Sequence, residues 1–358
     1  MKKIFKSLLL AALFVLPFAS CTKDDPTPVV TFDKKVLIIN QGNYSEQSAS
    51  LSLYDENTMQ ITNRIYETAN GVSIGATIVS GVVSPQKEAY LVCNNPDKIE
   101  IIDATTGKTK SSFTTGLASP RNIIFAGDKL YVTNWDYDHI VNSEGWWEFN
   151  KSYVAVFDAV TKTLLGKILV GTDAEGLALF GNRLFVATKE GVAVVDVSNP
   201  AYPIIKTITA SGVTGGAKHL TFDASYNLWA SFPSKGIVKI NPSTATASVV
   251  VDVPVDGMDG YITTGDNGQK IYTYKTTFNA SYEAVDASVY AVDVNTNTAT
   301  KFFSGTYFYG LGISPSTGNL FTAEVSFTSN SLLKVVGKDG VVKSSAAAGI
   351  GTSRYLFF

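Results

Sequence analysis

The chain has 358 residues, of which 45% are hydrophobic and only 17% are charged, a composition that indicates a large core and excludes a disordered chain. The 29 basic and 31 acidic residues nearly cancel, so no basic field exists to hold a nucleic acid. With two Cys and two His, the sequence also excludes a disulfide scaffold and leaves little for a His-rich metal site.

The N-terminus has the pattern of a secretory signal peptide over residues 1–20. Three Lys residues precede an apolar run over 8–18, which is too short to span a bilayer. Ala19 and Ser20 then stand directly before Cys21, and this order resembles a bacterial lipobox. The resemblance implies that Cys21 becomes the acylated N-terminus of a lipid-anchored protein, and more than one acyl chain would make the anchor stable.

Residues 21–34 read as a flexible tether between the lipid and the folded part. Lys23, Asp24 and Asp25 resemble the surface-export signal of Bacteroidota lipoproteins, although short charged tethers are also common without any signal. The resemblance implies an outer-membrane protein that faces the cell exterior.

The rest of the chain predicts an all-β fold built from repeats. Short β-branched and aromatic runs alternate with Gly, Asn, Asp and Pro, and no long 3.6-residue periodicity appears. An apolar residue followed by Asp, or its degenerate equivalent, marks each unit at intervals of roughly 40 to 55 residues, about the length of a four-stranded propeller blade. The markers end at Asp55, Asp103, Asp158, Asp196, Asn241, Asp293 and Gly337. Seven markers predict a seven-bladed β-propeller.

The two ends of the chain predict how the ring closes. The first unit starts directly at Val36 and lacks an opening strand, whereas 351–358 matches the opening strands of later units. A C-terminal strand that pairs in the N-terminal blade leaves no unpaired edge in the ring. We therefore expect one propeller domain over 35–358.

This repeat resembles the YncE-like family of seven-bladed propellers over nearly all of the chain after the signal peptide. The opening segment "VLIINQGNYSEQSASLSLYD", followed by "ITNRIYETANG", is similar to the first blade of surface propeller lipoproteins that capture cobalamin, vitamin B12. Members of that group work beside a TonB-dependent outer-membrane transporter. The resemblance implies a non-catalytic protein that binds cobalamin as a transported ligand and uses no cofactor.

Ligand contacts are expected on the face formed by the loops before each inner strand and between each second and third strand. Three of the four Trp residues fall in one long insertion of the third blade. There they either pack on the scaffold or form a binding surface for a ligand with a large apolar face. The fourth, Trp229, lies in an apolar strand, so we expect its side chain to be buried in the core. The candidate ligand-binding residues are Asn40, Tyr44, Asn94, Arg121, Asn134, Trp135, Trp146, Trp147, Glu175, Lys218, Asp259, Phe278, Tyr307, Tyr309 and Arg354.

The charged candidates predict a ring of mixed sign at the channel mouth. Such groups either neutralise one another as structural pairs or supply the donors and acceptors that an amide-rich ligand needs, whereas an anion site would need a basic excess. At least one of Tyr307, Phe308 and Tyr309 is expected to point into the channel mouth, while Phe308 could instead be core between blades; alternation of side chains along a strand allows both.

Other functions remain open on the same residues. A siderophore or a glycan would use similar aromatic and amide groups, and a surface for protein interaction would need no small ligand. A propeller lactonase would need a metal at the mouth, for which Glu175, Asp259, His219 and Asn94 are the conceivable ligands. A second cation could be imagined in the Trp-rich insertion, which also contains Asp136, Asp138, His139, Glu144 and Glu148.

Overall fold

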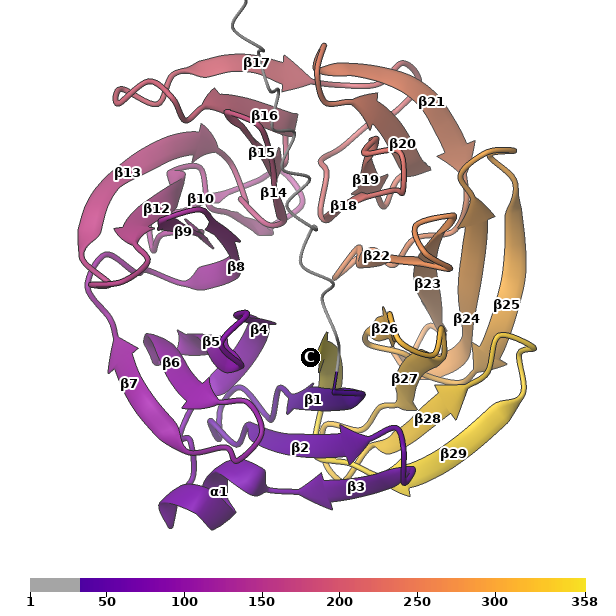
Figure 1. Cartoon of the computed structure of the whole chain (residues 1–358). Coiled ribbons are helices and arrows are strands. Elements are labelled where there is room, and N and C mark those ends of the chain that lie inside the picture. Colours follow the sequence, from indigo (N-terminus) through magenta and orange to yellow (C-terminus); the bar gives the residue numbers. More distant parts are fainter. Residues whose placement is uncertain (1–32) are drawn as a thin grey trace, which may run out of the picture. The chain divides into compact units, whose positions relative to one another are not determined.

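The structure, a computed structural model, describes residues 33–358, which form a ring of seven four-stranded antiparallel sheets (Figure 1). Each sheet is one blade, and its four strands are ordered from the central channel to the rim. The seven-bladed propeller predicted from the sequence is confirmed. The predicted signal peptide, the lipid site at Cys21 and the tether up to residue 32 lie outside the described residues.

The first three blades contain the chain closure and the Trp-rich insertion. From the channel outward their strands are, for blade 1, β30 (Thr352–Phe357), β1 (Lys35–Asn40), β2 (Ser50–Asp55) and β3 (Gln60–Asn63); for blade 2, β4 (Thr77–Val83), β5 (Glu88–Asn95), β6 (Asp97–Asp103) and β7 (Thr109–Phe113); for blade 3, β8 (Pro120–Ala126), β9 (Lys129–Asn134), β12 (Ser152–Asp158) and β13 (Leu164–Gly171). A separate hairpin of β10 (Ile140–Val141) and β11 (Trp147–Glu148) lies between β9 and β12 in the chain.

The other four blades follow the chain in simple order. Their strands are, for blade 4, β14 (Leu177–Phe180), β15 (Arg183–Thr188), β16 (Gly191–Asp196) and β17 (Ile204–Ile208); for blade 5, β18 (Leu220–Phe222), β19 (Leu228–Phe232), β20 (Gly236–Asn241) and β21 (Thr246–Asp252); for blade 6, β22 (Ile262–Gly265), β23 (Lys270–Phe278), β24 (Ala284–Asp293) and β25 (Ala299–Gly305); for blade 7, β26 (Leu311–Ile313), β27 (Leu320–Glu324), β28 (Leu332–Val336) and β29 (Val342–Ala347).

The ring closes through the two ends of the described chain, as the sequence predicted. The C-terminal strand β30 pairs antiparallel with β1, with Val36 opposite Phe357 and Ile38 opposite Tyr355. Tyr355 is buried and packs with Val36 and Ile38 in one core cluster. The pairing gives β1 partners on both sides, so β1 itself has no exposed edge toward the channel.

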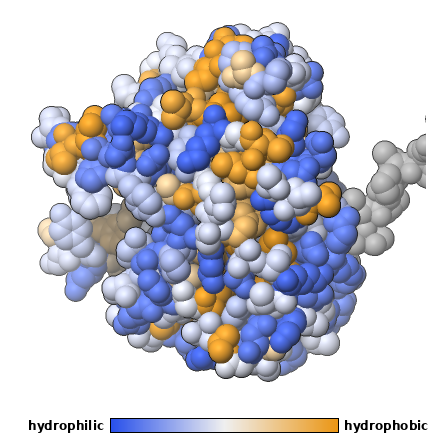
Figure 2. Space-filling model, turned by 90° about the vertical axis from the view of Figure 1, so that its left-hand side faces the viewer, coloured by the Kyte–Doolittle hydropathy of each residue, from blue (hydrophilic) through white to orange (hydrophobic). Residues whose placement is uncertain are grey.

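Burial along the strands follows from the stacking of blades face to face. The second strands β1 and β9 are buried at five of their six positions, because both faces of a blade pack against neighbouring blades. Outer strands are more exposed, and β13 exposes Leu165 and Leu169 at the rim. Figure 2 faces the side of the ring that carries β7 and β13, where hydrophobic side chains form separate patches between hydrophilic ones.

The repeated Asp that marks each unit in the sequence has a local structural cause. In blade 2, Asp103 Oδ1 accepts the backbone N–H of Thr105 at 3.0 Å and that of Thr106 at 2.8 Å. Asp158 and Asp293 accept the corresponding N–H groups in blades 3 and 6. A carboxylate that accepts these bonds fixes the tight turn between the third and fourth strands, so the marker has a structural role in the turn.

One short helix departs from the all-β expectation. Helix α1 (Ile65–Asn70) connects blades 1 and 2, buries Ile65 and Tyr66, and ends at Gly71, whose φ of 73° suits a residue without a side chain. Six residues are too few to produce a helical periodicity in the sequence. Among residues 33–358, no helix has the length and hydropathy needed to cross a membrane.

Candidate functional site

The Trp-rich insertion of blade 3 forms a hairpin on the face that carries the inter-blade loops. Asn142 holds its turn, because Oδ1 accepts the N–H of Trp146 at 2.9 Å while Nδ2 donates to Glu148 Oε1 at 2.7 Å. Trp146 and Trp147 remain 69% and 63% exposed. The ring of Trp147 stacks on His139, with 4.3 Å between ring centroids. The hairpin therefore has a stable backbone and presents two large aromatic faces to solvent.

Trp135 lies deeper, at the base of this hairpin. Its ring stacks on Phe149 with a centroid distance of 4.8 Å, and the Arg121 guanidinium lies 4.0 Å from its centroid in a cation–π contact. Its Nε1–H is buried and has no hydrogen-bond partner in the described part of the chain. Trp135 is thus partly packed on its own scaffold, with one polar group left unsatisfied.

These aromatic residues form the wall of an open pocket of about 520 Å³, which we call the Trp pocket. Its lining residues are Trp135, Gly145, Trp146, Trp147, Phe149, Asp173 and Lys218. Three Trp and one Phe give it an apolar side, and Asp173 and Lys218 give it a charged side. Such a pocket suits a flat, partly apolar ligand with polar groups at one edge.

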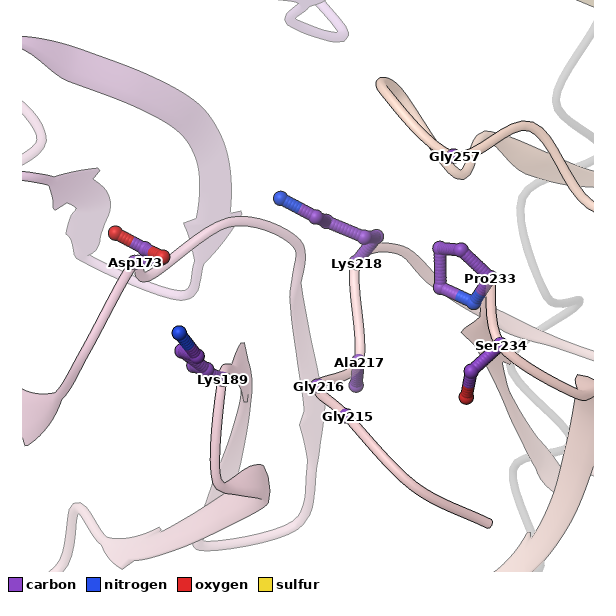
Figure 3. Close-up of a pocket in the computed structure, with 9 residues that line it drawn as sticks. All are labelled: Asp173, Lys189, Gly215, Gly216, Ala217, Lys218, Pro233, Ser234 and Gly257. Carbon is purple, nitrogen blue, oxygen red and sulfur yellow. The ribbon is translucent and has the colours of Figure 1, made fainter. Parts of the chain in front are cut away.

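A second pocket of about 270 Å³ adjoins the Trp pocket through Asp173 and Lys218, which line both. We call it the loop pocket, because it lies between loops of blades 3 to 6 (Figure 3). Its lining residues are Asp173, Lys189, Gly215, Gly216, Ala217, Lys218, Pro233, Ser234 and Gly257. Figure 3 shows the Lys218 side chain extending from its loop in the direction of Asp173.

Asp173 occupies an unusual backbone conformation at this junction. Its φ is +51°, which is uncommon for a residue with a side chain. The backbone N–H of Phe149 donates to its Oδ1 at 2.9 Å and so ties the loop before blade 4 to the Trp hairpin. Burial raises the pKa of the Asp173 carboxyl, against the opposing effects of the Phe149 N–H and of Lys218.

The charges at the channel mouth form pairs. Arg121 donates through Nε and Nη2 to the two carboxylate oxygens of Glu175, each at 3.2 Å. On the other side of the mouth, Arg354 Nη2 lies 2.5 Å from Asp259 Oδ1, and its guanidinium lies 4.6 Å from the Tyr261 ring centroid. Burial acts to lower the pKa of Arg354, but the charge and hydrogen bond of Asp259, together with Tyr261 and Tyr274, raise that pKa overall. Both pairs are largely buried, and each links residues of different blades.

His219 packs beside the second pair. Its ring lies 4.3 Å from that of Tyr261, and its Nδ1 is buried with no partner among residues 33–358. Burial and the nearby Arg354 charge lower the pKa of His219 to about 4. The imidazole is therefore neutral at physiological pH and adds no charge to the mouth.

A group of aromatic residues lies over blades 6 and 7. Tyr307 meets Phe278 edge to face at 5.6 Å, and Tyr309 meets Phe327 in the same way at 5.2 Å. Phe308 between them is fully buried in the core, which is one of the two arrangements that the alternation allowed. Tyr307 and Tyr309 are half-buried, whereas Trp146 and Trp147 of the Trp pocket are mostly exposed to solvent.

Two predicted ligand contacts are wrong. Asn40 and Asn134 are completely buried. The amide of Asn40 donates to Ser52 Oγ and accepts from the Gly349 N–H, while Asn134 accepts from the Ala118 N–H and donates to a backbone carbonyl. Both side chains therefore fasten the ends of strands and cannot reach a ligand.

The remaining two candidates lie on the loops of blades 1 and 2. Tyr44 is exposed, and its carbonyl accepts the side-chain amide of Asn95 at 2.9 Å. Asn94 is half-buried, and its Oδ1 has no hydrogen-bond partner in the part of the chain that the structure describes. Neither lines the Trp pocket.

Among residues 33–358, no three His, Cys, Asp or Glu side chains converge as a metal site would require. In the Trp insertion, Asp138 pairs with Lys151 and Glu148 pairs with Lys189, so two of the four carboxylates considered there as cation ligands already have partners. Glu175 and Asp259 are likewise held by Arg121 and Arg354.

The loop contacts reveal participants that the sequence did not indicate as ligand-binding. Phe149 could have been included, since it belongs to the same aromatic insertion. Asp173 and Lys189 lie on loops of blade 4, and Gly215 and Gly216 precede blade 5. Their convergence depends on the ring geometry, so no local sequence signal reveals it.

The fold and this face together define a seven-bladed propeller with an open aromatic pocket among its loops. The chain belongs to the family described as "Domain of unknown function (DUF5074)", whose model matches residues 34–337. No curated protein matches it significantly.

Solved structures resemble it in fold. One is a protein assigned, without proof of activity, as a 6-phosphogluconolactonase from Bacteroides fragilis, with 14% identity, a TM-score of 0.63 and coverage of 91% of this chain and 99% of that one. The periplasmic gluconolactonase PpgL of Pseudomonas aeruginosa gives 14% identity, a TM-score of 0.62 and coverage of 90% and 99%. A third, the dihydro-heme d1 dehydrogenase NirN, gives 10% identity, a TM-score of 0.60 and coverage of 91% and 76%. At such identities the likeness concerns the fold alone, and one fold supports many functions.

Proposed function

We propose that this protein is a non-catalytic capture protein that binds a bulky, partly planar ligand in the Trp pocket, and that this ligand is cobalamin. The observation that carries the proposal is the pair of Trp side chains, each more than 60% exposed, on a hairpin whose backbone is hydrogen-bonded into shape. Exposing two indoles to water is unfavourable, and a ligand with a large apolar face would remove that cost.

The chemistry of cobalamin matches both sides of the pocket. A corrin is wide and partly apolar, so its face can lie against the indole rings, and its rim carries amides that need both donors and acceptors. Asp173 and Lys218 supply one of each at the edge of the same pocket. The volume of about 520 Å³ accommodates part of such a ligand and leaves the rest open to solvent.

Ligand titration with fluorescence detection tests the proposal. Cyanocobalamin, a ferric siderophore and an oligosaccharide are titrated into the protein, and an assay of lactone hydrolysis runs on the same sample. We expect saturable binding of cyanocobalamin, confirmed by calorimetry because the coloured ligand also absorbs light. Tight binding of the siderophore or the glycan with none of cyanocobalamin would overturn the choice of ligand, and turnover of a lactone would overturn the non-catalytic assignment.

Matched Trp variants locate the site. Trp146→Ala and Trp147→Ala should weaken cyanocobalamin binding by about 2 kcal/mol for the better-placed ring, as aromatic anchors commonly do. Trp229→Phe is the control, because Trp229 is fully buried in blade 5 and donates its Nε1–H to Asp223 Oδ2 at 3.0 Å. This control should lower stability and leave the affinity of the folded protein unchanged.

The proposed setting is the outer membrane, with the protein anchored through Cys21 and delivering its ligand to a TonB-dependent transporter. Cys21→Ala should release soluble protein. Replacement of Lys23, Asp24 and Asp25 by Ala should preserve lipidation but hide the protein from protease added to whole cells. Persistent accessibility would contradict the export signal, and co-purification of a TonB-dependent transporter with the wild-type protein checks the partner.

A further inference from the structure

Among the described residues, Lys218 is the cation of the two adjoining pockets that lacks a carboxylate partner. Lys189 pairs with Glu148, and Arg121 at the channel mouth pairs with Glu175. Lys218 forms no ion pair and its ammonium makes no hydrogen bond within residues 33–358, although its side chain is only half-buried and extends toward Asp173 in Figure 3. An ammonium held on a loop in this way is available to an acceptor on a ligand.

Asp173 offers the complementary acceptor. Its Oδ1 is used by the Phe149 N–H, whereas its Oδ2 receives no hydrogen bond within the described ranges. The bond to Phe149 and the fixed φ of +51° hold the carboxyl at one position on the pocket wall. The junction of the Trp pocket and the loop pocket thus has a free donor on Lys218 and a free acceptor on Asp173.

We infer that this junction recognises a primary carboxamide at the edge of the ligand, whose oxygen accepts from Lys218 while its NH₂ group donates to Asp173. A carboxamide carries an acceptor and two donors on one planar group, so it can satisfy both residues at once. A carboxylate or a phosphate would accept from Lys218 but would meet the negative charge of Asp173. A cationic amine would meet the opposite conflict at Lys218.

The position of the junction couples this recognition to the aromatic wall. Asp173 and Lys218 line both pockets, and the Trp pocket continues from them to Trp135, Trp146 and Trp147. A ring that stacks on the indoles therefore brings its rim to Lys218 and Asp173. The inference rests on the proposed function. It adds that Lys218 and Asp173 distinguish one amide at the rim of the ligand from the corresponding carboxylic acid.

The test compares cyanocobalamin with its separated monocarboxylic acids, in each of which one side-chain amide has been hydrolysed. Wild-type protein should bind cyanocobalamin about ten-fold or more tightly than one of these acids, because a hydrogen bond to a charged group is lost and a repulsion is created. Asp173→Asn should bring that ratio close to one or reverse it, and Lys218→Met should increase it.

The variants are chosen to preserve the fold. Asn tolerates a positive φ and keeps an oxygen for the Phe149 N–H, and Met keeps the aliphatic stem of Lys218 that packs close to Gly260. Lys206→Met and Asp128→Asn, on exposed residues outside both pockets, are the matched controls for loss of charge and should leave every ratio unchanged. Unaltered ratios in Asp173→Asn and Lys218→Met would overturn the inference.

A second pair of probes separates this inference from the proposed ligand. Benzamide and benzoate differ only in the group to be recognised, and ligand-observed NMR detects their weak binding. Preference for benzamide that disappears in Asp173→Asn supports the amide site even if no cobalamin binds. If cobalamin binds and depends on Trp147 but the acids bind as well as the amide, the proposed function stands and the inference fails. If neither benzamide nor cobalamin binds, both are wrong.

Discussion

The Trp pocket and the channel mouth lie on loops of the same kind, but their groups are satisfied to different degrees. At the mouth, Arg354 and Asp259 pair at 2.5 Å and the guanidinium also covers the Tyr261 ring. In the Trp pocket, Trp146 and Trp147 expose most of their surface and Lys218 has no carboxylate partner within residues 33–358.

This difference distinguishes a structural constellation from a binding one. Charged and aromatic groups that already satisfy one another gain little from a ligand, and breaking them costs stability. Removing a group that has no partner costs the free protein little stability. The same group can contribute most to the binding free energy, because a ligand supplies its first partner. Variants at the mouth should therefore change stability, and variants in the Trp pocket should change affinity.

The largest effect is expected from removing the strand on which the mouth depends. Deletion of 352–358 removes Arg354 together with Tyr355 and Phe357, and it exposes the edge of β1. Each large apolar side chain contributes about 1.5 to 3 kcal/mol when buried, and a domain is stable by only about 5 to 15 kcal/mol. The truncated protein should unfold or aggregate. A monomer with unchanged thermal melting would contradict the closure.

Next in size is the loss of one partner from the pair at the mouth. Arg354→Met leaves Asp259 buried without its cation, which typically costs about 3 to 5 kcal/mol. Chemical denaturation should show this loss. The double variant Arg354→Met, Asp259→Asn should recover part of it, because no uncompensated charge remains. Equal stability of wild type and the single variant would show that the pair is not structural.

A smaller effect is expected from the titration of His219. Its pKa is lowered from 6.5 to about 4 in the folded protein, where Arg354, Asp259 and Tyr261 face the ring. Between these values the unfolded chain binds the proton more readily, so this residue should reduce stability by up to about 3 kcal/mol as the pH falls from 6.5 to 4. His219→Gln should remove that part of the pH dependence, measured by denaturation at several pH values, whereas His139→Gln in the exposed hairpin should not.

The smallest effect on stability is expected at the exposed Trp residues. Trp146→Ala and Trp147→Ala should change the free energy of unfolding by no more than about 0.5 kcal/mol, since their side chains are mostly in water. The measurement is thermal or chemical denaturation without ligand. A loss of several kcal/mol would mean that the hairpin packs on the scaffold in solution and would weaken its assignment as a ligand surface.

Much of the fold could be predicted because its signals are local. The Asp that fixes each turn, the apolar second strands and the missing first strand lie within single repeats, so counting repeats gave the number of blades and the closure. The same applies to Trp229 in the core and to the aromatic insertion in blade 3. Each of these features depends on neighbours within one blade or on the need to close a ring.

Only the tertiary structure decided which groups belong to a site. Arg354 and Asp259 are 95 residues apart in the chain, and the ring brings them together as a pair. The same geometry buries Asn40 and Asn134 at strand ends and places Asp173 beside Lys218 at the edge of the Trp pocket. A sequence shows which residues stand on the loops of one face, but whether a charge is paired or free depends on distances between blades.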